Sequence, residues 1–94
     1  MPRSGEIHSD KMKYKISAHA AEQMIKRNIA QVIVDNILNK PEQIIDKENY
    51  SVYQAMIDEN GKSYLYRVFV NTKNNPYVVI TVYKTSKTDK YYEG

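Results

Sequence analysis

The segment that decides the fold reads SYLYRVFVN over residues 63–71, TKNNP over residues 72–76 and YVVITVYK over residues 77–84. β-branched and aromatic residues fill its first and last parts, whereas turn-forming residues fill the middle. This pattern predicts two strands, Ser63–Asn71 and Tyr77–Lys84, that are joined as a hairpin. Strict alternation of side chains along the second strand gives one shared face, formed by Tyr77, Val79, Thr81 and Tyr83.

Polar groups interrupt this apolar hairpin at three positions. Arg67 lies in the first strand, and Thr81 and the hydroxyl end of Tyr83 lie in the second. Most neighbouring side chains are apolar, so at least one face of the hairpin must be buried. The polar set therefore forms either a buried hydrogen-bonded network or a functional site.

Two helices and a short strand are predicted upstream of the hairpin. The first helix runs from Ala18 to Arg27 with Ser17 as its N-cap. The second runs from about Gln31 to Asn39, where Pro41 stops it. The short strand, Tyr14–Ile16, precedes both helices.

The middle of the chain adds strand-forming segments. Gln43–Asp46 reads as a short strand or an extended approach, and Tyr50–Ile57 alternates as a strand does. Asp58–Gly61 is typical of a hairpin turn. The order of elements predicts the α+β class, with a short N-terminal strand and two N-terminal helices packed on one face of an antiparallel sheet. The opposite face must then be solvated or bind something.

Length and composition limit the class of protein. The 94 residues suffice for one small domain. We expect residues 1–12 to be disordered and residues 13–94 to form the domain, which ends in a basic, aromatic tail. The chain has no cysteine, which fits a cytoplasmic location, and we expect neither a membrane span nor a secretory signal.

Charge is distributed unevenly along the chain, whose formal net charge is +3. Residues 1–41 carry seven basic residues against four acidic ones, residues 42–61 one against five, and residues 62–94 six against two. If the two basic ends meet in the fold, one surface becomes positive, as a polyanion partner requires. An ordinary solvated surface explains the same counts.

Several kinds of chemistry are poorly supported. The two histidines, His8 and His19, are well separated in the sequence and the carboxylates are scattered, so we expect no metal site. The three glycines are isolated, which argues against a phosphate-binding loop, and we expect no cofactor.

The remaining polar residues match a metal-independent cleavage of RNA. Such a reaction needs a base for the 2′-hydroxyl proton, fixed cations for the phosphate and an acid for the leaving oxygen. Histidine titrates near neutral pH, arginine holds phosphate oxygens with two N–H groups, and tyrosine stacks on unpaired bases. The candidates are His19, Arg27, Arg67, Thr81, Tyr83 and Lys84, with Tyr64, Tyr66, Tyr83, Tyr91 and Tyr92 as stacking residues.

Each candidate also has a structural interpretation. His19 could cap the first turn of its helix, and Arg67 could pair with an acid on a neighbouring element. Thr81 is a good strand residue, and Tyr83 could pack and hydrogen-bond without reacting. Only the combination of residues favours a site.

Residues 17–29, which read SAHAAEQMIKRNI, resemble the opening signature of the Domain of Unknown Function 4258 family: Ser-x-His-Ala, then Met, then Arg-x-Ile. Further matching positions are Pro41, Arg67-Val68, Ile80–Lys84, Thr85–Lys87 and Lys90-Tyr91. The resemblance covers roughly residues 13–92. The chain departs from the family at Gln23, where an Arg is common, and this departure puts one phosphate contact in question.

That family is similar to the BrnT and RelE-like toxins of bacterial toxin–antitoxin systems. The resemblance implies two helices on an antiparallel sheet and a cytoplasmic endoribonuclease that is held in check by a cognate antitoxin protein. Our leading hypothesis is therefore a metal-independent ribonuclease acting on RNA, such as mRNA, and the alternative is a non-catalytic protein- or nucleic-acid-binding module. The residues assigned to catalysis are His19, Arg67, Tyr83 and Thr81, and those assigned to substrate binding are Arg27, Lys84, Lys87 and Tyr91.

Overall fold

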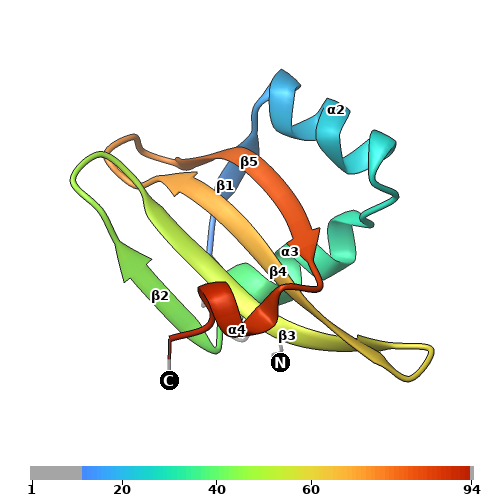
Figure 1. Ribbon diagram of the computed structural model, residues 1–94. Helices are drawn as coiled ribbons and strands as arrows, with labels where there is room; N and C mark the ends of the chain where they lie inside the picture. Colours follow the sequence, from blue (N-terminus) through green and yellow to red (C-terminus); the bar gives the residue numbers. More distant parts are fainter. Residues whose placement is uncertain (1–11, 94) are drawn as a thin grey trace, which may run out of the picture.

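The computed structural model describes residues 12–93, which form a five-stranded sheet and three helices (Figure 1). The sheet order is β1-β5-β4-β3-β2. In chain order the elements are β1 (Tyr14–Ile16), α2 (Ala18–Lys26), α3 (Gln31–Asn39), β2 (Gln43–Asp46), β3 (Ser51–Glu59), β4 (Lys62–Asn71), β5 (Tyr77–Thr85) and α4 (Thr88–Tyr91). The α+β class is confirmed, and the predicted helices and strands lie within a few residues of the observed ones.

The sheet is mixed, so the prediction of an antiparallel sheet is wrong at one edge. Strands β2 to β5 pair antiparallel through short connections, but β1 pairs parallel to β5, with Tyr14 opposite Tyr77. The sequence placed β1 correctly without revealing its partner. Parallel pairing requires a long connection, and here two helices and three strands separate the paired segments.

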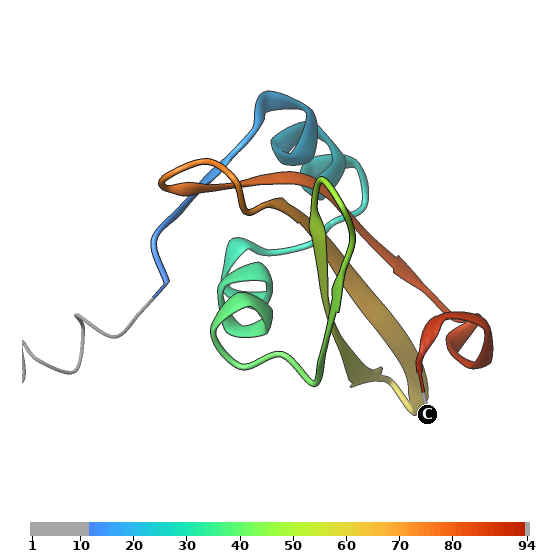
Figure 2. The same cartoon turned by 90° about the vertical axis from the view of Figure 1, so that its left-hand side faces the viewer.

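The sequence predicted that the two N-terminal helices, α2 and α3, pack on one face of the sheet. The structure shows a different arrangement. α3 contacts β3 and β4 on one face, and α4 lies on the opposite face against β4 (Figure 2). α2 begins where the Ser17 hydroxyl accepts a hydrogen bond of 3.1 Å from the Ala20 amide, and it then follows the outer edge of β5. α4 falls within the segment predicted to be a tail.

A β-bulge in β5 overturns the predicted alternation of its side chains. Phe69 pairs with Thr81 and Val70 pairs with Val79, so the described ladder gives Ile80 no partner on β4. The extra residue reverses the faces that follow it. Val79 therefore joins the buried core beneath the helices, whereas Thr81 lies opposite Phe69 on the other face.

The core lies between the sheet and the helices α2 and α3. Its fully buried side chains include Val68 and Val82, which face each other on β4 and β5. Met24 and Leu38 contribute from the two helices. The sequence predicted disorder for residues 1–12, and all of these except Met12 lie outside the described residues. The Met12 amide donates a 2.8 Å hydrogen bond to Asn39 Oδ1. This packing leaves the opposite sheet face only partly covered, by α4.

Candidate functional site

Four polar side chains form a continuous ladder across the sheet face that carries α4. They occupy facing positions on consecutive strands, with Gln43 opposite Gln54, Gln54 opposite Arg67 and Arg67 opposite Tyr83. Gln54 Nε2 donates to Gln43 Oε1 at 2.6 Å, and Arg67 Nε donates to Gln54 Oε1 at 2.9 Å. Arg67 Nη1 then donates to the Tyr83 hydroxyl at 2.8 Å. Two of the three predicted polar residues, Arg67 and Tyr83, therefore belong to a hydrogen-bonded network on this sheet face.

Arg67 is the only cation in this ladder, and its charge is not neutralised by a neighbouring acid. No carboxylate of residues 12–93 lies within ion-pair distance of its guanidinium. A guanidinium carries five N–H groups, and Arg67 uses one on Nε and one on Nη1. Three N–H groups thus make no hydrogen bond to the described part of the chain. Such N–H groups are the donors with which a guanidinium binds an anion.

Aromatic rings surround the Arg67 guanidinium. Its central carbon lies 4.7 Å from the ring centre of Tyr91, 5.3 Å from Phe69 and 5.8 Å from Tyr83. Phe69 also stacks on Tyr50 at 5.6 Å, so the rings form a row along the sheet face. Cation–π contacts of this kind hold a guanidinium plane in place without removing its charge.

Gln54 belongs to the candidate site, although the sequence analysis did not single it out. Its side chain is completely buried, and its amide also donates to the Tyr91 carbonyl at 3.2 Å. The Gln43 side chain accepts a further hydrogen bond from the Glu93 amide at 3.0 Å. These bonds hold α4 beside Arg67. In the sequence, only the presence of a glutamine inside a predicted strand pointed to Gln54. Its role could not be inferred without knowing that Arg67 lies opposite it on β4.

The structure does not bring His19 into this group. His19 is exposed near the start of α2, and strand β5 lies between α2 and Arg67 on β4. No hydrogen bond among the described residues joins His19 to Arg67 or Tyr83. Its Nε2 lies 3.0 Å from Gln23 Nε2. Because the Gln23 carbonyl oxygen already accepts from the Val82 amide, the Gln23 NH₂ group donates and His19 Nε2 accepts.

Gln23 and Arg27 together cover the free edge of β5. Gln23 Oε1 accepts from the Val82 amide at 3.0 Å, and Arg27 Nη1 donates to the Val82 carbonyl at 2.9 Å. The two residues are four positions apart and therefore share one side of α2. β1 pairs with β5 only as far as Val79, and beyond it these two side chains bond the Val82 backbone groups that a neighbouring strand would otherwise bond. Arg27 thus has a structural partner, although the sequence assigned it to substrate binding.

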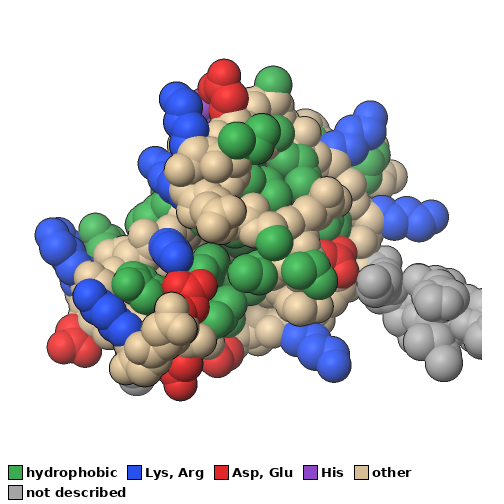
Figure 3. Space-filling view, turned by 90° about the vertical axis from the view of Figure 1, so that its right-hand side faces the viewer, with side chains coloured by type: hydrophobic (Ala, Val, Ile, Leu, Met, Phe, Trp, Pro, Cys, Tyr) green, Lys and Arg blue, Asp and Glu red, His purple; other side chains and the backbone are tan. Residues whose placement is uncertain are grey.

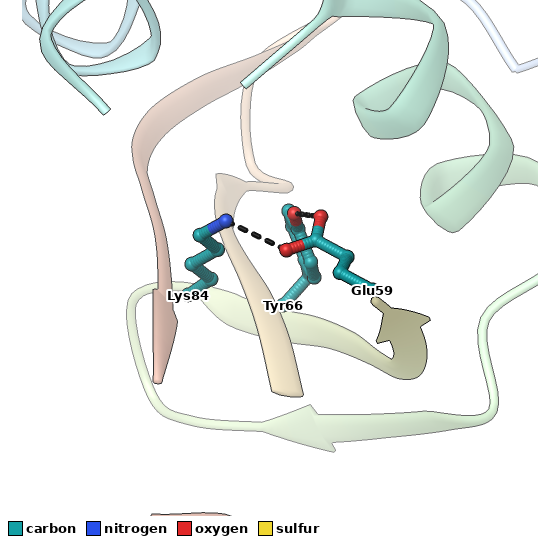
Figure 4. Close-up of polar contacts among 3 residues, drawn as sticks. All are labelled: Glu59, Tyr66 and Lys84. Carbon is teal, nitrogen blue, oxygen red and sulfur yellow. Dashed lines mark hydrogen bonds and ion pairs between the residues drawn. The ribbon is translucent and has the colours of Figure 1, made fainter. Parts of the chain in front are cut away.

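Lys84 lies on the sheet face that α3 covers, opposite to Arg67, within a second polar cluster (Figure 4). Its Nζ is 2.8 Å from Glu59 Oε1, and the other Glu59 oxygen accepts from the Tyr66 hydroxyl. The hydrogen bond from Lys84, followed by that from Tyr66, lowers the pKa of Glu59 below its ordinary 4.5. Burial and then Glu59 raise the pKa of Tyr66. This cluster neutralises its own charges.

The other predicted residues lie around the Arg67 face or outside it. Tyr91, on α4, packs over the Arg67 guanidinium, and Thr81 lies on the same sheet face as Arg67. Lys87 is exposed just before α4. Residues 12–93 hold no group of three or more histidine or carboxylate side chains placed to bind a metal ion. None of the helices within that range has the length and hydrophobicity to span a bilayer.

The chain was compared with known protein families, curated proteins and solved structures. No curated protein and no solved structure matches the chain. One family description, Domain of unknown function (DUF4258), matches residues 16–84, from the end of β1 to the last part of β5. The match covers more than half of the chain and includes both α2 and the Arg67 strand. The chain therefore belongs to the DUF4258 family.

Proposed function

We propose that this chain is a small metal-independent endoribonuclease of toxin type, which holds single-stranded RNA on the sheet face around Arg67. The observation that carries the proposal is the Arg67 guanidinium, which is oriented by Gln54 and Tyr83. Three of its N–H groups make no hydrogen bond to residues 12–93. Two such groups side by side match the oxygens of a phosphate.

The aromatic row supports a single-stranded ligand. Every base has a flat face, so rings such as Tyr91 and Tyr83 can stack on unpaired bases while the guanidinium contacts the backbone. Two exposed basic residues, Lys87 and Lys90, lie at the start of α4 and within it. A duplex would hide its base faces, which makes unpaired RNA the better ligand.

The proposed reaction begins when the RNA 2′-oxygen loses its proton and attacks the adjacent phosphorus. The bond from phosphorus to the 5′-oxygen breaks, which leaves a 2′,3′-cyclic phosphate and a free 5′-hydroxyl. Arg67 would stabilise the charge on the phosphate oxygens, and Tyr83 would give its proton to the leaving oxygen. His19 would take the 2′-hydroxyl proton if the RNA crosses the edge of β5 and displaces the Gln23 amide from His19 Nε2.

Two features of the family resemblance support this assignment. Members resemble the BrnT and RelE-like toxins, and both the Ser-x-His-Ala signature of α2 and the Arg67 strand belong to the resemblance. On this basis we expect a cytoplasmic protein whose activity is restrained by a separate antitoxin protein.

The test is cleavage of a fluorescent, unstructured RNA by the purified protein in the presence of EDTA. We expect products ending in a 2′,3′-cyclic phosphate, and we expect Arg67→Ala to lower the rate by about a hundredfold or more. Arg67→Lys should restore little, since lysine lacks the planar fork. Lys73→Ala, in the exposed turn between β4 and β5, is the matched control. Loss of cleavage with EDTA, or full activity of Arg67→Ala, would refute the proposal.

A second candidate function, RNA binding without cleavage, is favoured by the position of His19. Its Nε2 is occupied by Gln23, and β5 separates it from Arg67. Under this alternative, RNA would bind with strong salt dependence and would remain intact. His19→Ala would then leave RNA affinity unchanged, whereas Arg67→Ala would still weaken it. Under the ribonuclease proposal His19→Ala slows cleavage.

A further inference from the structure

An open groove of about 970 Å³ lies between β1, the second half of α2 and the first residues of α3. Its apolar lining includes Ile16, Met24, Ile25 and Ile29. On the side of the molecule shown in Figure 3, hydrophobic side chains gather across the middle of the view, and both basic and acidic side chains project around its margin. The groove shares no lining residue with the Arg67 face.

Two hydrophobic residues, one that lines the groove on α2 and one that follows a lining residue on α3, are exposed far more than their chemistry favours. Ile25 is 81% exposed and lines the groove, and Val32 is 63% exposed and follows the lining residue Gln31. The third large exposed hydrophobic residue of the described chain, Ile44, lies on β2 at the opposite edge of the sheet. An apolar groove with an exposed apolar rim is a surface suited to a partner.

The charge around the groove identifies the kind of partner. All lining residues fall within residues 12–31, which contain Lys13, Lys15, Lys26, Arg27 and Glu22. One more acid, Asp35, accepts a 3.0 Å hydrogen bond from the lining residue Tyr14, so the net charge of this set is 4 − 2 = +2. Lys13 itself lines the groove. α3 also starts there, with Ala30 as its N-cap; it has neither a side-chain cap within the described chain nor an acid in its first turn. Its first amides add positive partial charge to the same end of the groove.

We propose that this groove binds an acidic amphipathic helix from a partner protein. Apolar side chains on one side of that helix would enter the groove beside Ile25, and its carboxylates would face Lys13 and the start of α3. A second copy of this chain fits poorly, because a symmetric contact would bring two surfaces of the same net positive charge together. The proposal concerns a different surface from the Arg67 face and does not depend on the proposed function.

The experiment is a selection from a phage-displayed library of helical peptides with randomised exposed positions. The full chain is the bait, and Ile25→Asp protein removes peptides that bind elsewhere. Because Ile25 is exposed, the substitution should leave the fold intact, which circular dichroism and thermal melting verify. We expect the enriched peptides to be net negative, with apolar residues repeating at three- and four-residue intervals.

The most enriched peptide is then synthesised with a fluorescent label, and its binding to the protein is measured by fluorescence anisotropy. We expect at least about tenfold weaker binding to Ile25→Asp, weaker binding to Lys13→Glu, and unchanged binding to the control Ile44→Asp. Failure to enrich any peptide, enrichment of basic peptides, or equal affinity for Ile25→Asp would overturn the proposal. Sedimentation of the wild type as a dimer that Ile25→Asp dissociates would overturn it in favour of self-association. Binding to phosphatidylserine vesicles through Ile25, without selection of acidic peptides, would overturn it in favour of a membrane.

Discussion

Arg67 and Tyr83 face each other on β4 and β5, and the guanidinium of Arg67 donates a 2.8 Å hydrogen bond to the Tyr83 hydroxyl. The hydroxyl thereby accepts a charged donor while its own proton remains free to be given to a ligand. Arg67 is fixed from its other side by Gln54, so its unused N–H groups have a defined direction. The pair forms the centre of the proposed RNA site.

Tyr83→Phe separates binding from chemistry at this pair. The ring is kept, so stacking and RNA affinity should change little, whereas the hydroxyl is lost. We expect cleavage to slow by about a hundredfold if Tyr83 protonates the leaving oxygen, with a stability loss of about 1 kcal/mol. Quantifying both RNA affinity and single-turnover cleavage checks this. Equal cleavage by the variant and the wild type would remove Tyr83 from the reaction.

Gln54→Glu should disable the site by supplying the acid that Arg67 lacks. The new carboxylate would lie where Gln54 Oε1 now accepts from Arg67 Nε at 2.9 Å, and the ion pair would offset the guanidinium charge. We expect RNA affinity to fall by about tenfold or more. Gln54→Met is the matched control: it should destabilise the fold by about 1–3 kcal/mol but leave Arg67 unpaired and able to bind RNA. Equal RNA affinity of both variants would contradict the role given to the unpaired charge.

Gln23 should be required for stability because its carbonyl oxygen covers the Val82 amide. Gln23→Ala should cost about 1–2 kcal/mol in the free energy of unfolding. Gln23→Arg, which restores the residue common in the family, should cost a similar amount, since a guanidinium has no acceptor for that amide. Urea denaturation measures both, with the exposed Lys26→Ala as a control expected within about 0.5 kcal/mol of wild type. A Gln23→Arg protein as stable as wild type would show that the edge of β5 can be covered otherwise.

Glu59→Gln should reveal a pH-dependent contribution to stability. The folded-state pKa of Glu59 is lowered, first by Lys84 and then by Tyr66, so its ionised form favours the fold. This contribution is present above the ordinary pKa of 4.5 and is lost as pH falls through the lower folded-state value. The variant should therefore be less stable than wild type at pH 7, and the difference should shrink below pH 4.5. Denaturation curves across this range test it; a difference that grows on acidification would be inconsistent with the lowered pKa.

Local sequence patterns predicted most of the elements. The β-branched runs of β4 and β5, the Ser17 cap of α2 and the turn at Asn60-Gly61 each act over a few residues, so their effect is visible in the sequence. Asn60 and Gly61 indeed adopt positive φ, at 52° and 82°. The strong alternation of β5 was misleading because a bulge depends on the partner strand as well as on the strand itself.

The sequence by itself determined the α+β class, the position of nearly every helix and strand, and the family to which the chain belongs. It also marked Arg67 and Tyr83 as polar exceptions in apolar strands. Only the tertiary structure decided which residues meet: it joined these two to Gln54 and α4, and it left His19 on the far side of β5. Secondary structure arises from neighbouring residues, whereas strand order and register are fixed by burial across the whole sheet.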